Sequence, residues 1–106
     1  MKVSHRPSMK STSSFGPALR FTREALGIPQ EEFDQVSSRT YVSALERGLK
    51  QPTIAKVDTL ATVLGIHPLT LLALCYCSKP DAKQAEQVLA RVHDEMAALM
   101  AAGKRA

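Results

Sequence analysis

The sequence has few aromatic residues and no tryptophan. Two tyrosines and three phenylalanines make up 5% of its 106 residues, whereas 44% of the residues are hydrophobic. A chain of this length forms one domain, or one domain with an appendage. Because its apolar residues are mainly aliphatic, we expect an aliphatic core carried on helices.

Long apolar runs and a cysteine framework are also missing. The longest apolar run, Leu71 to Cys77, is far shorter than the ~20 residues of a membrane-spanning helix. No apolar stretch follows Met1-Lys2, so no signal peptide is expected. The two cysteines, Cys75 and Cys77, are separated by one residue and form no disulfide framework. These absences predict a protein of the reducing cytoplasm, not inserted in a membrane.

The residue combinations that catalysis or metal binding requires do not occur. There is no pair of carboxylates, no Ser-His-Asp set and no glycine-rich phosphate loop. On a helix Cys75 and Cys77 would diverge by roughly 200°, and His67 and His93 have no ligand-like spacing to them. We therefore expect no enzyme, no cofactor and no metal site, with both cysteines as small packing residues.

Charge of one sign is concentrated at the N-terminus. Residues 1–14 carry Lys2, Arg6 and Lys10 and no acid. The six basic and six acidic residues of 15–78 cancel, and residues 79–106 carry one net positive charge. Residues 1–14 lack apolar periodicity, which predicts a flexible basic arm or a plain disordered tail.

From residue 15 onward, apolar residues recur at helical spacing and no strand pattern occurs. Caps and glycines divide the chain into expected helices at about 15–27, 29–37, 38–48, 53–65, 68–76 and 81–102, with Ser14 as the first candidate cap. Phe33 and Val36 should point inward, and Ile54, Val57, Leu60, Ala61 and Leu64 should form an apolar stripe that ends at Gly65. The predicted fold is all-α, with an arm (1–14), a helical domain (15–78) and a C-terminal helix (79–106).

The segment "SSRTYVSALERG", Ser37 to Gly48, has the most informative pattern. Val42 and Leu45 are three residues apart and should face the core. The opposite face then carries Arg39, Thr40, Ser43, Ala44 and Arg47, with Tyr41 on a flank. A narrow polar and cationic face of this kind suits the DNA major groove, although an ordinary solvated face would have the same spacing. Ser38 at the N-cap leaves an end whose free N–H groups favour phosphate.

From Ala18 to Leu72 the sequence resembles the Cro/C1-type (XRE-like) helix-turn-helix family of phage and bacterial repressors. The resemblance is carried by "LRFTREALGIPQEEF", "SSRTYVSALERG", "QPTIAKVDTLATVLGI" and "LTLLAL". Its diagnostic features are Gln30 opening the second helix, "LERG" closing the third and Pro52 before the fourth. The resemblance implies a five-helix bundle that binds double-stranded DNA as a two-fold dimer.

The same resemblance implies roles for individual residues. Base-reading positions would be Arg39, Thr40, Ser43 and Ala44. Phosphate contacts would come from Gln30, Ser38, Tyr41, Arg47, Lys50 and Thr53. Arg23 and Glu46 match a partly buried ion pair between the first and third helices; the alternative is two separate surface charges.

The sequence departs from the family pattern between Gln30 and Glu46, where it is about two residues shorter. The small residue and the glycine that shape the family's turn are missing, and Asp34 lies near the small-residue position. We therefore expect the second helix to be cut short, or the turn compressed, around Gln35 to Ser38.

The last predicted helix carries an apolar seam at alternating steps of four and three residues: Ala85, Leu89, Val92, Met96 and Leu99. This is the spacing of a coiled-coil interface, although such a stripe can also pack on the protein's own bundle. We expect it to form a homodimer. The sequence as a whole predicts a dimeric, sequence-specific transcriptional regulator, most simply a repressor. The alternatives are an antitoxin whose last helix binds a toxin, and a protein-interaction module that has lost DNA binding.

Overall fold

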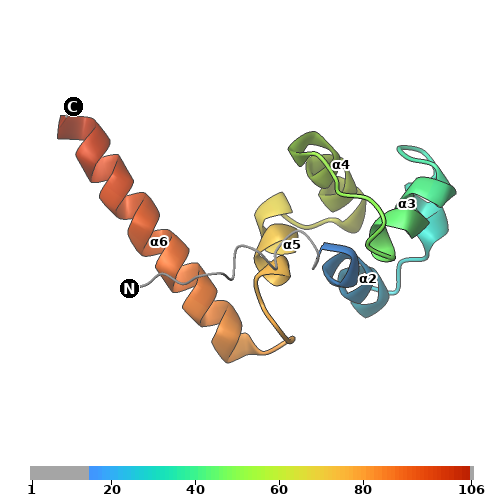
Figure 1. The fold of residues 1–106 in the computed structure, drawn as a ribbon, viewed down its shortest axis with the longest axis horizontal. Coiled ribbons are helices and arrows are strands. Elements are labelled where there is room, and N and C mark those ends of the chain that lie inside the picture. The colour runs from blue at the N-terminus through green and yellow to red at the C-terminus, as the bar shows by residue number, and fades with distance from the viewer. Residues whose placement is uncertain (1–14, 106) are drawn as a thin grey trace. The chain divides into compact units, whose positions relative to one another are not determined.

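The computed structural model describes residues 15–105, and side chains as far as Lys104. Over this range the chain is all-helical and contains no strand (Figure 1). The elements in chain order are α2 (Phe15–Ala25), the 3-10 helix η1 (Gln30–Phe33), α3 (Arg39–Glu46), α4 (Ile54–Leu64), α5 (Pro68–Cys75) and α6 (Ala82–Arg105). The all-α prediction is confirmed for these residues, whereas the expected arm and the cap at Ser14 lie outside them.

The chain divides into two compact units, one ending at Tyr76 and one beginning at Cys77. In the first unit, each element contributes to one core whose largest fully buried side chains are Phe33, Leu19, Leu45, Leu60, Leu71 and Val42. The core is aliphatic apart from two phenylalanines, Phe15 and Phe33. α2 packs against α3 and α5, and η1 packs against α3 and α4. Burial of these apolar faces is what holds elements this short in place.

Capping side chains begin α3 and α4 where the sequence predicts them. The Oγ of Ser38 accepts a hydrogen bond from the backbone N–H of Tyr41 at 3.0 Å, and the Oγ1 of Thr53 accepts one from Lys56 at 3.1 Å. α4 ends at Gly65, whose φ of 75° lies in the left-handed region that favours glycine. Local chemistry therefore fixes the bounds of both helices.

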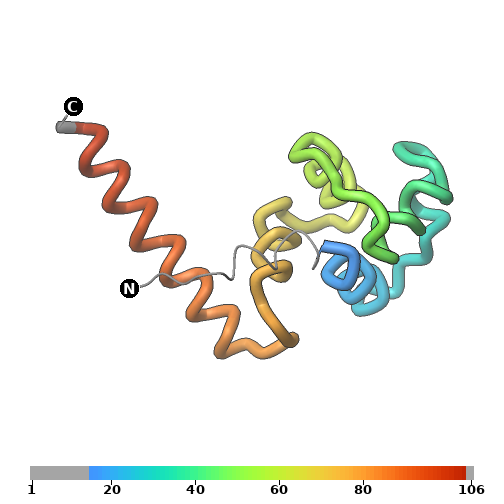
Figure 2. The backbone as a smooth tube through the Cα atoms, viewed as in Figure 1, coloured from blue at the N-terminus to red at the C-terminus, as the bar shows by residue number. Residues whose placement is uncertain are grey.

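The second helix is cut short, as the reduced spacing predicts. It consists of the single 3-10 turn η1, followed by turns and a bend over residues 34–37 (Figure 2). The prediction that Val36 points inward is wrong, because its side chain is 38% exposed; Ile54, at the start of the apolar stripe, is 83% exposed. Val36 lies in the turn, where helical spacing from Phe33 no longer applies. Ile54 is the first residue of α4 and precedes the turn of that helix that meets the core.

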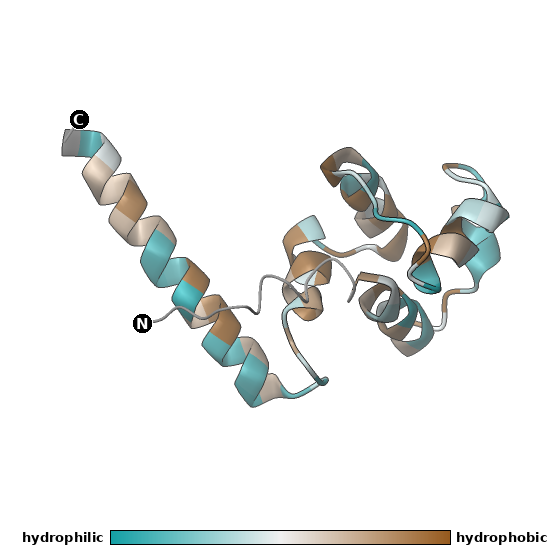
Figure 3. Cartoon of the chain, viewed as in Figure 1, coloured by the Kyte–Doolittle hydropathy of each residue, from teal (hydrophilic) through white to brown (hydrophobic). Residues whose placement is uncertain are grey.

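The second unit contains one described helix, α6, of 24 residues. It begins after Asp81, whose Oδ1 accepts a hydrogen bond from the backbone N–H of Lys83 at 3.0 Å, and continues past the predicted end at Ala102. Apolar residues recur along it (Figure 3). No single helix within residues 15–105 is long and apolar enough to cross a membrane; α4 and α5 pass that test of length and composition only as a pair bent by 110°.

Candidate DNA-binding surface

α3 is held against the core by its inner face and against α2 by its C-terminal end. Val42 and Leu45 are both fully buried. At Gly16, in the first turn of α2, an added Cβ would lie 2.5 Å from the carbonyl oxygen of Leu45 and 2.6 Å from that of Glu46. Those atoms are backbone and cannot swing away, so the close approach of the two helices requires glycine at this position.

A polar network also joins α2 to α3. The Nε of Arg23 lies 2.7 Å from Oε2 of Glu46, and its Nη2 lies 3.0 Å from Oε1, which gives a two-pronged ion pair. The two side chains are 13% and 5% exposed. The Nη1 of Arg23 donates to the carbonyl oxygen of Ile28 at 3.2 Å, and the amide of Gln30 donates to Oε1 of Glu46 at 3.0 Å. The hydrogen bond to Glu46 raises the pKa of the Arg23 guanidinium, although burial opposes this.

The outer face of α3 is narrower than its spacing predicts. Arg39, Thr40 and Arg47 are exposed and Ser43 is partly exposed, whereas Ala44 is only 7% exposed. Ala44, one of the predicted base-reading positions, is therefore almost covered by the bundle. α3 packs against α2 on one side and η1 on another, so its buried arc is wider than Val42 and Leu45 alone indicate.

Arg39 has an acidic partner from the shortened turn. Its Nη2 lies 3.1 Å from Oδ2 of Asp34, and both side chains are about half exposed, at 55% and 49%. This hydrogen bond, with the negative charge of Asp34, raises the pKa of the Arg39 guanidinium. Asp34 is thus placed to hold Arg39 at the leading end of α3.

The expected phosphate-contacting residues divide into those with partners and those without. Ser38 and Thr53 use their hydroxyl oxygens as helix caps, and Gln30 donates to Glu46. Arg47 is exposed, and its Nε donates to Oγ of Ser43 at 3.3 Å. Lys50 is exposed and makes no side-chain hydrogen bond or ion pair within the described range.

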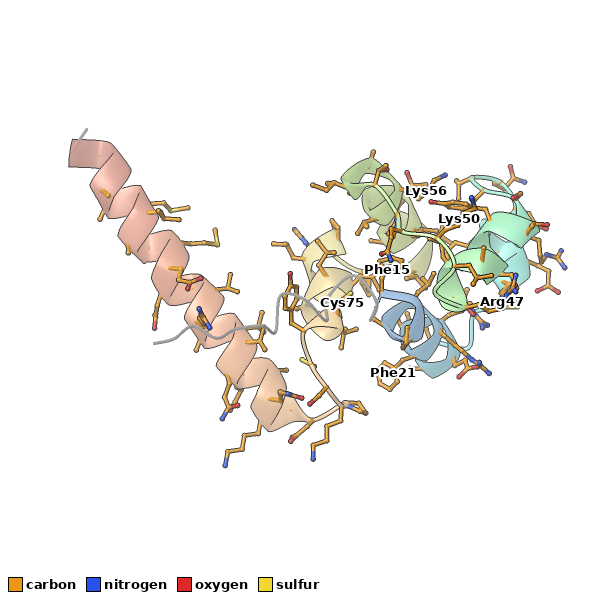
Figure 4. The ribbon with its side chains drawn as sticks, in the orientation of Figure 1. Phe15, Phe21, Arg47, Lys50, Lys56 and Cys75 are labelled. Carbon is orange, nitrogen blue, oxygen red and sulfur yellow. The ribbon has the colours of Figure 1, made fainter. Side chains whose placement is uncertain are left out.

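Lys56 belongs to this surface, although the sequence did not single it out. Its Nζ donates to the carbonyl oxygen of Val36 at 3.3 Å and lies 5.4 Å from the centre of the Tyr41 ring. Arg47 directly follows α3, Lys50 lies in the loop after it, and Lys56 lies in α4 (Figure 4). Helical side chains lean toward the N-terminus, so a lysine three residues after the cap at Thr53 reaches back beyond its helix. The sequence predicts that the Lys56 side chain points toward the N-terminal end of α4, but it does not predict the contacts with Val36 and Tyr41.

No group of three or more His, Cys, Asp or Glu residues that could hold a metal ion occurs in the part of the chain that the structure describes. Cys75 is buried and Cys77 partly buried.

Comparison with known families identifies the class of protein. A family model described as helix-turn-helix matches residues 19–71, half of the 106-residue chain. The chain belongs to this family, which is of the XRE/Cro/C1 type and consists of DNA-binding transcription regulators. The matched segment runs from α2 into α5 and includes all of η1, α3 and α4. No curated protein and no solved structure matched the chain.

Proposed function

We propose that this protein is a cytoplasmic transcriptional repressor that binds an inverted-repeat DNA operator as a homodimer. The observation that carries the proposal is the outer face of α3, where Arg39, Thr40 and Ser43 are accessible on a helix anchored from behind. Arginine bonds bidentately to guanine, and serine or threonine pairs with any base, so these three residues are the base readers.

Around them, groups from several elements contact phosphate. Lys50 and Arg47 supply positive charge, Tyr41 a phenolic hydroxyl, and the capped starts of α3 and α4 supply backbone N–H groups at Ser38 and Thr53. Gln30, the first residue of η1, contacts phosphate at the N-terminal end of that helix, in addition to its hydrogen bond with Glu46. One α3 spans only a few base pairs, too few for specificity on a genome. Two copies related by a two-fold axis would read half-sites about one helical turn, ~34 Å, apart.

The apolar seam of α6 is the dimer interface in this proposal. Leu89, Val92, Met96 and Leu99 are between 43% and 70% exposed, and Ala85 lies one turn before Leu89. A lone helix cannot bury its own apolar face, and α6 has no second described helix in its unit. A second copy of α6 presents the same seam and covers it.

Selection of bound sequences from random duplex DNA tests the proposal directly, and inverted repeats should emerge. With the selected operator, Arg39→Ala should lower specific affinity by about tenfold or more while random-sequence affinity changes little. Lys50→Ala should weaken both about equally and reduce the salt slope by about one. If Arg39→Ala lowered specific and random-sequence affinity by the same factor, Arg39 would not be a base-reading residue. A wild-type protein without salt-dependent DNA binding would contradict the proposal and favour a protein-interaction module.

A further inference from the structure

The connection from η1 into α3 is short, yet α3 is fixed at its leading end. Between η1 and α3 there are five residues, 34–38, in turns, a bend and an extended cap. α3 packs on α2 and η1, and its buried ion pair, through Glu46, lies at its C-terminal end, whereas the pair of Arg39 with Asp34 at the other end is about half exposed. Its N-terminal end, where the base readers begin, needs an anchor of its own.

Lys56 supplies two contacts at that end. Its ammonium group donates to the carbonyl oxygen of Val36, two residues before the cap at Ser38. The same ammonium lies over the ring of Tyr41, in the first turn of α3. A cation within about 6 Å of an aromatic centroid is attracted to the ring face. One side chain of α4 therefore holds both the backbone that enters α3 and a side chain on α3.

The surroundings of Lys56 favour this role over that of a simple surface charge. Lys56 is partly buried and Tyr41 is partly buried, in contrast to the exposed Lys50. The α4 backbone at Lys56 is itself fixed, because its N–H donates to the capping Thr53 and the next residue, Val57, is 3% exposed. The lysine thus extends from a rigid base toward the turn.

We infer that Lys56 is a positioning residue for DNA recognition: through the Val36 carbonyl and the Tyr41 ring it sets the orientation of α3. The inference rests on the proposed DNA-binding function but makes a separate statement about the free protein. Loss of the ammonium should disturb the N-terminal half of α3 without unfolding the bundle, and specific DNA binding should suffer because the base readers move.

The test compares Lys56→Met, which keeps the aliphatic stem, with Lys56→Arg, which keeps a donor and a cation. Lys79→Met, at an exposed lysine after α5, controls for the loss of one positive charge. In the free protein, amide NMR shifts of Lys56→Met should change mainly over residues 36–44, and the ε-methylene protons of wild-type Lys56 should be shifted upfield by the Tyr41 ring. Tyr41→Leu should abolish that upfield shift.

Affinity for the selected operator should fall about tenfold in Lys56→Met, with the salt slope unchanged, and Lys56→Arg should restore most of it. The effects of Lys56→Met and Tyr41→Leu on affinity should be less than additive, because both remove the contact between the Lys56 ammonium and the Tyr41 ring, even though each also removes a contact of its own. A salt slope lower by about one, with unchanged shifts at residues 36–44, would make Lys56 a phosphate contact and overturn the inference. Unchanged shifts with unchanged affinity would overturn it as well.

The free-protein measurement separates this inference from the proposed function. If the wild type binds no DNA but the shifts at residues 36–44 move in Lys56→Met, the proposed function fails and the control of α3 by Lys56 stands. If the wild type binds its operator and Lys56→Met binds equally well, the function stands and the positioning role fails.

Discussion

The cations around α3 differ in the hydrogen bond or ion pair that each would have to break in order to contact DNA. Arg39 is bonded to a carboxylate, Arg47 to a hydroxyl and Lys56 to a carbonyl oxygen. Lys50 makes no such bond within the described range and is fully available. A cation that already has a partner exchanges one interaction for another, so its net contribution to affinity is smaller but its direction is set in advance. Lys50 should therefore contribute mainly affinity, and Arg39 mainly specificity.

Asp34→Asn tests whether the partner of Arg39 matters. The amide keeps the size of the side chain but removes the negative charge beside the DNA and the ionic bond to Arg39. We expect affinity for random DNA to rise by about two- to fivefold at low salt, because one repulsive charge is lost. The ratio of specific to random affinity should fall, because Arg39 is no longer held in one direction.

Asp58→Asn, at an exposed position of α4, is the matched control for Asp34→Asn. If both variants changed the two affinities alike, Asp34 would act only through net charge. An unchanged ratio in Asp34→Asn would show that the pair with Arg39 has no part in base discrimination.

At the scale of elements, the sequence predicts best where local chemistry decides. The ends of α3 and α4 are set by near neighbours. Hydrogen bonds to Ser38 and Thr53 fix where the two helices begin, and the left-handed backbone of Gly65 fixes where α4 ends. Sequence reasoning failed where burial depends on distant packing. Val36 and Ile54 have apolar side chains at helical spacing, yet both are exposed. Val36 lies in a turn where the expected helix is absent, and Ile54 lies at the start of α4, before the part of that helix that meets the core.

The surface around α3 was predictable in part for the same reason. The accessibility of Arg39 and Thr40 follows from the burial of Val42 and Leu45 on one short helix. The burial of Ala44 depends on how α2 and η1 flank that helix, and the contacts of Lys56 depend on where the turn passes α4. Neither arrangement has a periodic signature. The proximity of Arg23 and Glu46 follows from the family resemblance together with their positions at the inward edges of their apolar stripes.

Glu46→Ala should destabilise the bundle far more than loss of an exposed ion pair. It leaves the Gln30 amide without its acceptor, and leaves the partly buried Arg23 guanidinium with the Ile28 carbonyl oxygen but no counter-charge. We expect the free energy of unfolding to fall by about 2–4 kcal/mol, measured by urea denaturation. Glu24→Ala, which breaks the exposed pair with Arg20, is the control and should cost about 0–1 kcal/mol.

A double mutant with Arg23→Ala completes the cycle for Glu46. Removing both partners should cost less than the sum of the single losses, because no stranded charge remains. Small and additive effects would show that the pair contributes little beyond an ordinary surface contact.

At the scale of the whole molecule, the two units have different sources of stability. The first unit has a buried core shared by its helices. The second has a helix whose large apolar side chains, including Met100 at 61% exposure, need a partner surface. In the proposed repressor, assembly through this helix would decide whether two copies of α3 act together on DNA.

Leu89→Asp should convert the proposed dimer into a monomer with a folded first unit and much weaker operator binding. A charge in the middle of the seam cannot be buried without a large penalty. Sedimentation measures the assembly state, and circular dichroism checks the folded unit. Gln87→Asp, at an exposed position outside the seam, should leave the dimer intact. A chain ending at Ser78 that remained a tight dimer would contradict this, and would put the interface on the first unit, where Leu69 and Tyr76 are exposed.

The contact at Gly16 has an electrostatic consequence. It brings the start of α2, where backbone N–H groups carry positive partial charge, against the carbonyl oxygens of Leu45 and Glu46 at the end of α3. The negative end of the α3 dipole is thereby opposed by the positive end of another helix inside the bundle. The positive end of α3, at Ser38 and Arg39, has exposed residues and meets no such compensation from α2. The dipole of α3 is therefore compensated by a neighbouring helix only at its C-terminal end, and at its leading end the carboxylate of Asp34, beside Arg39, is the negative group nearby.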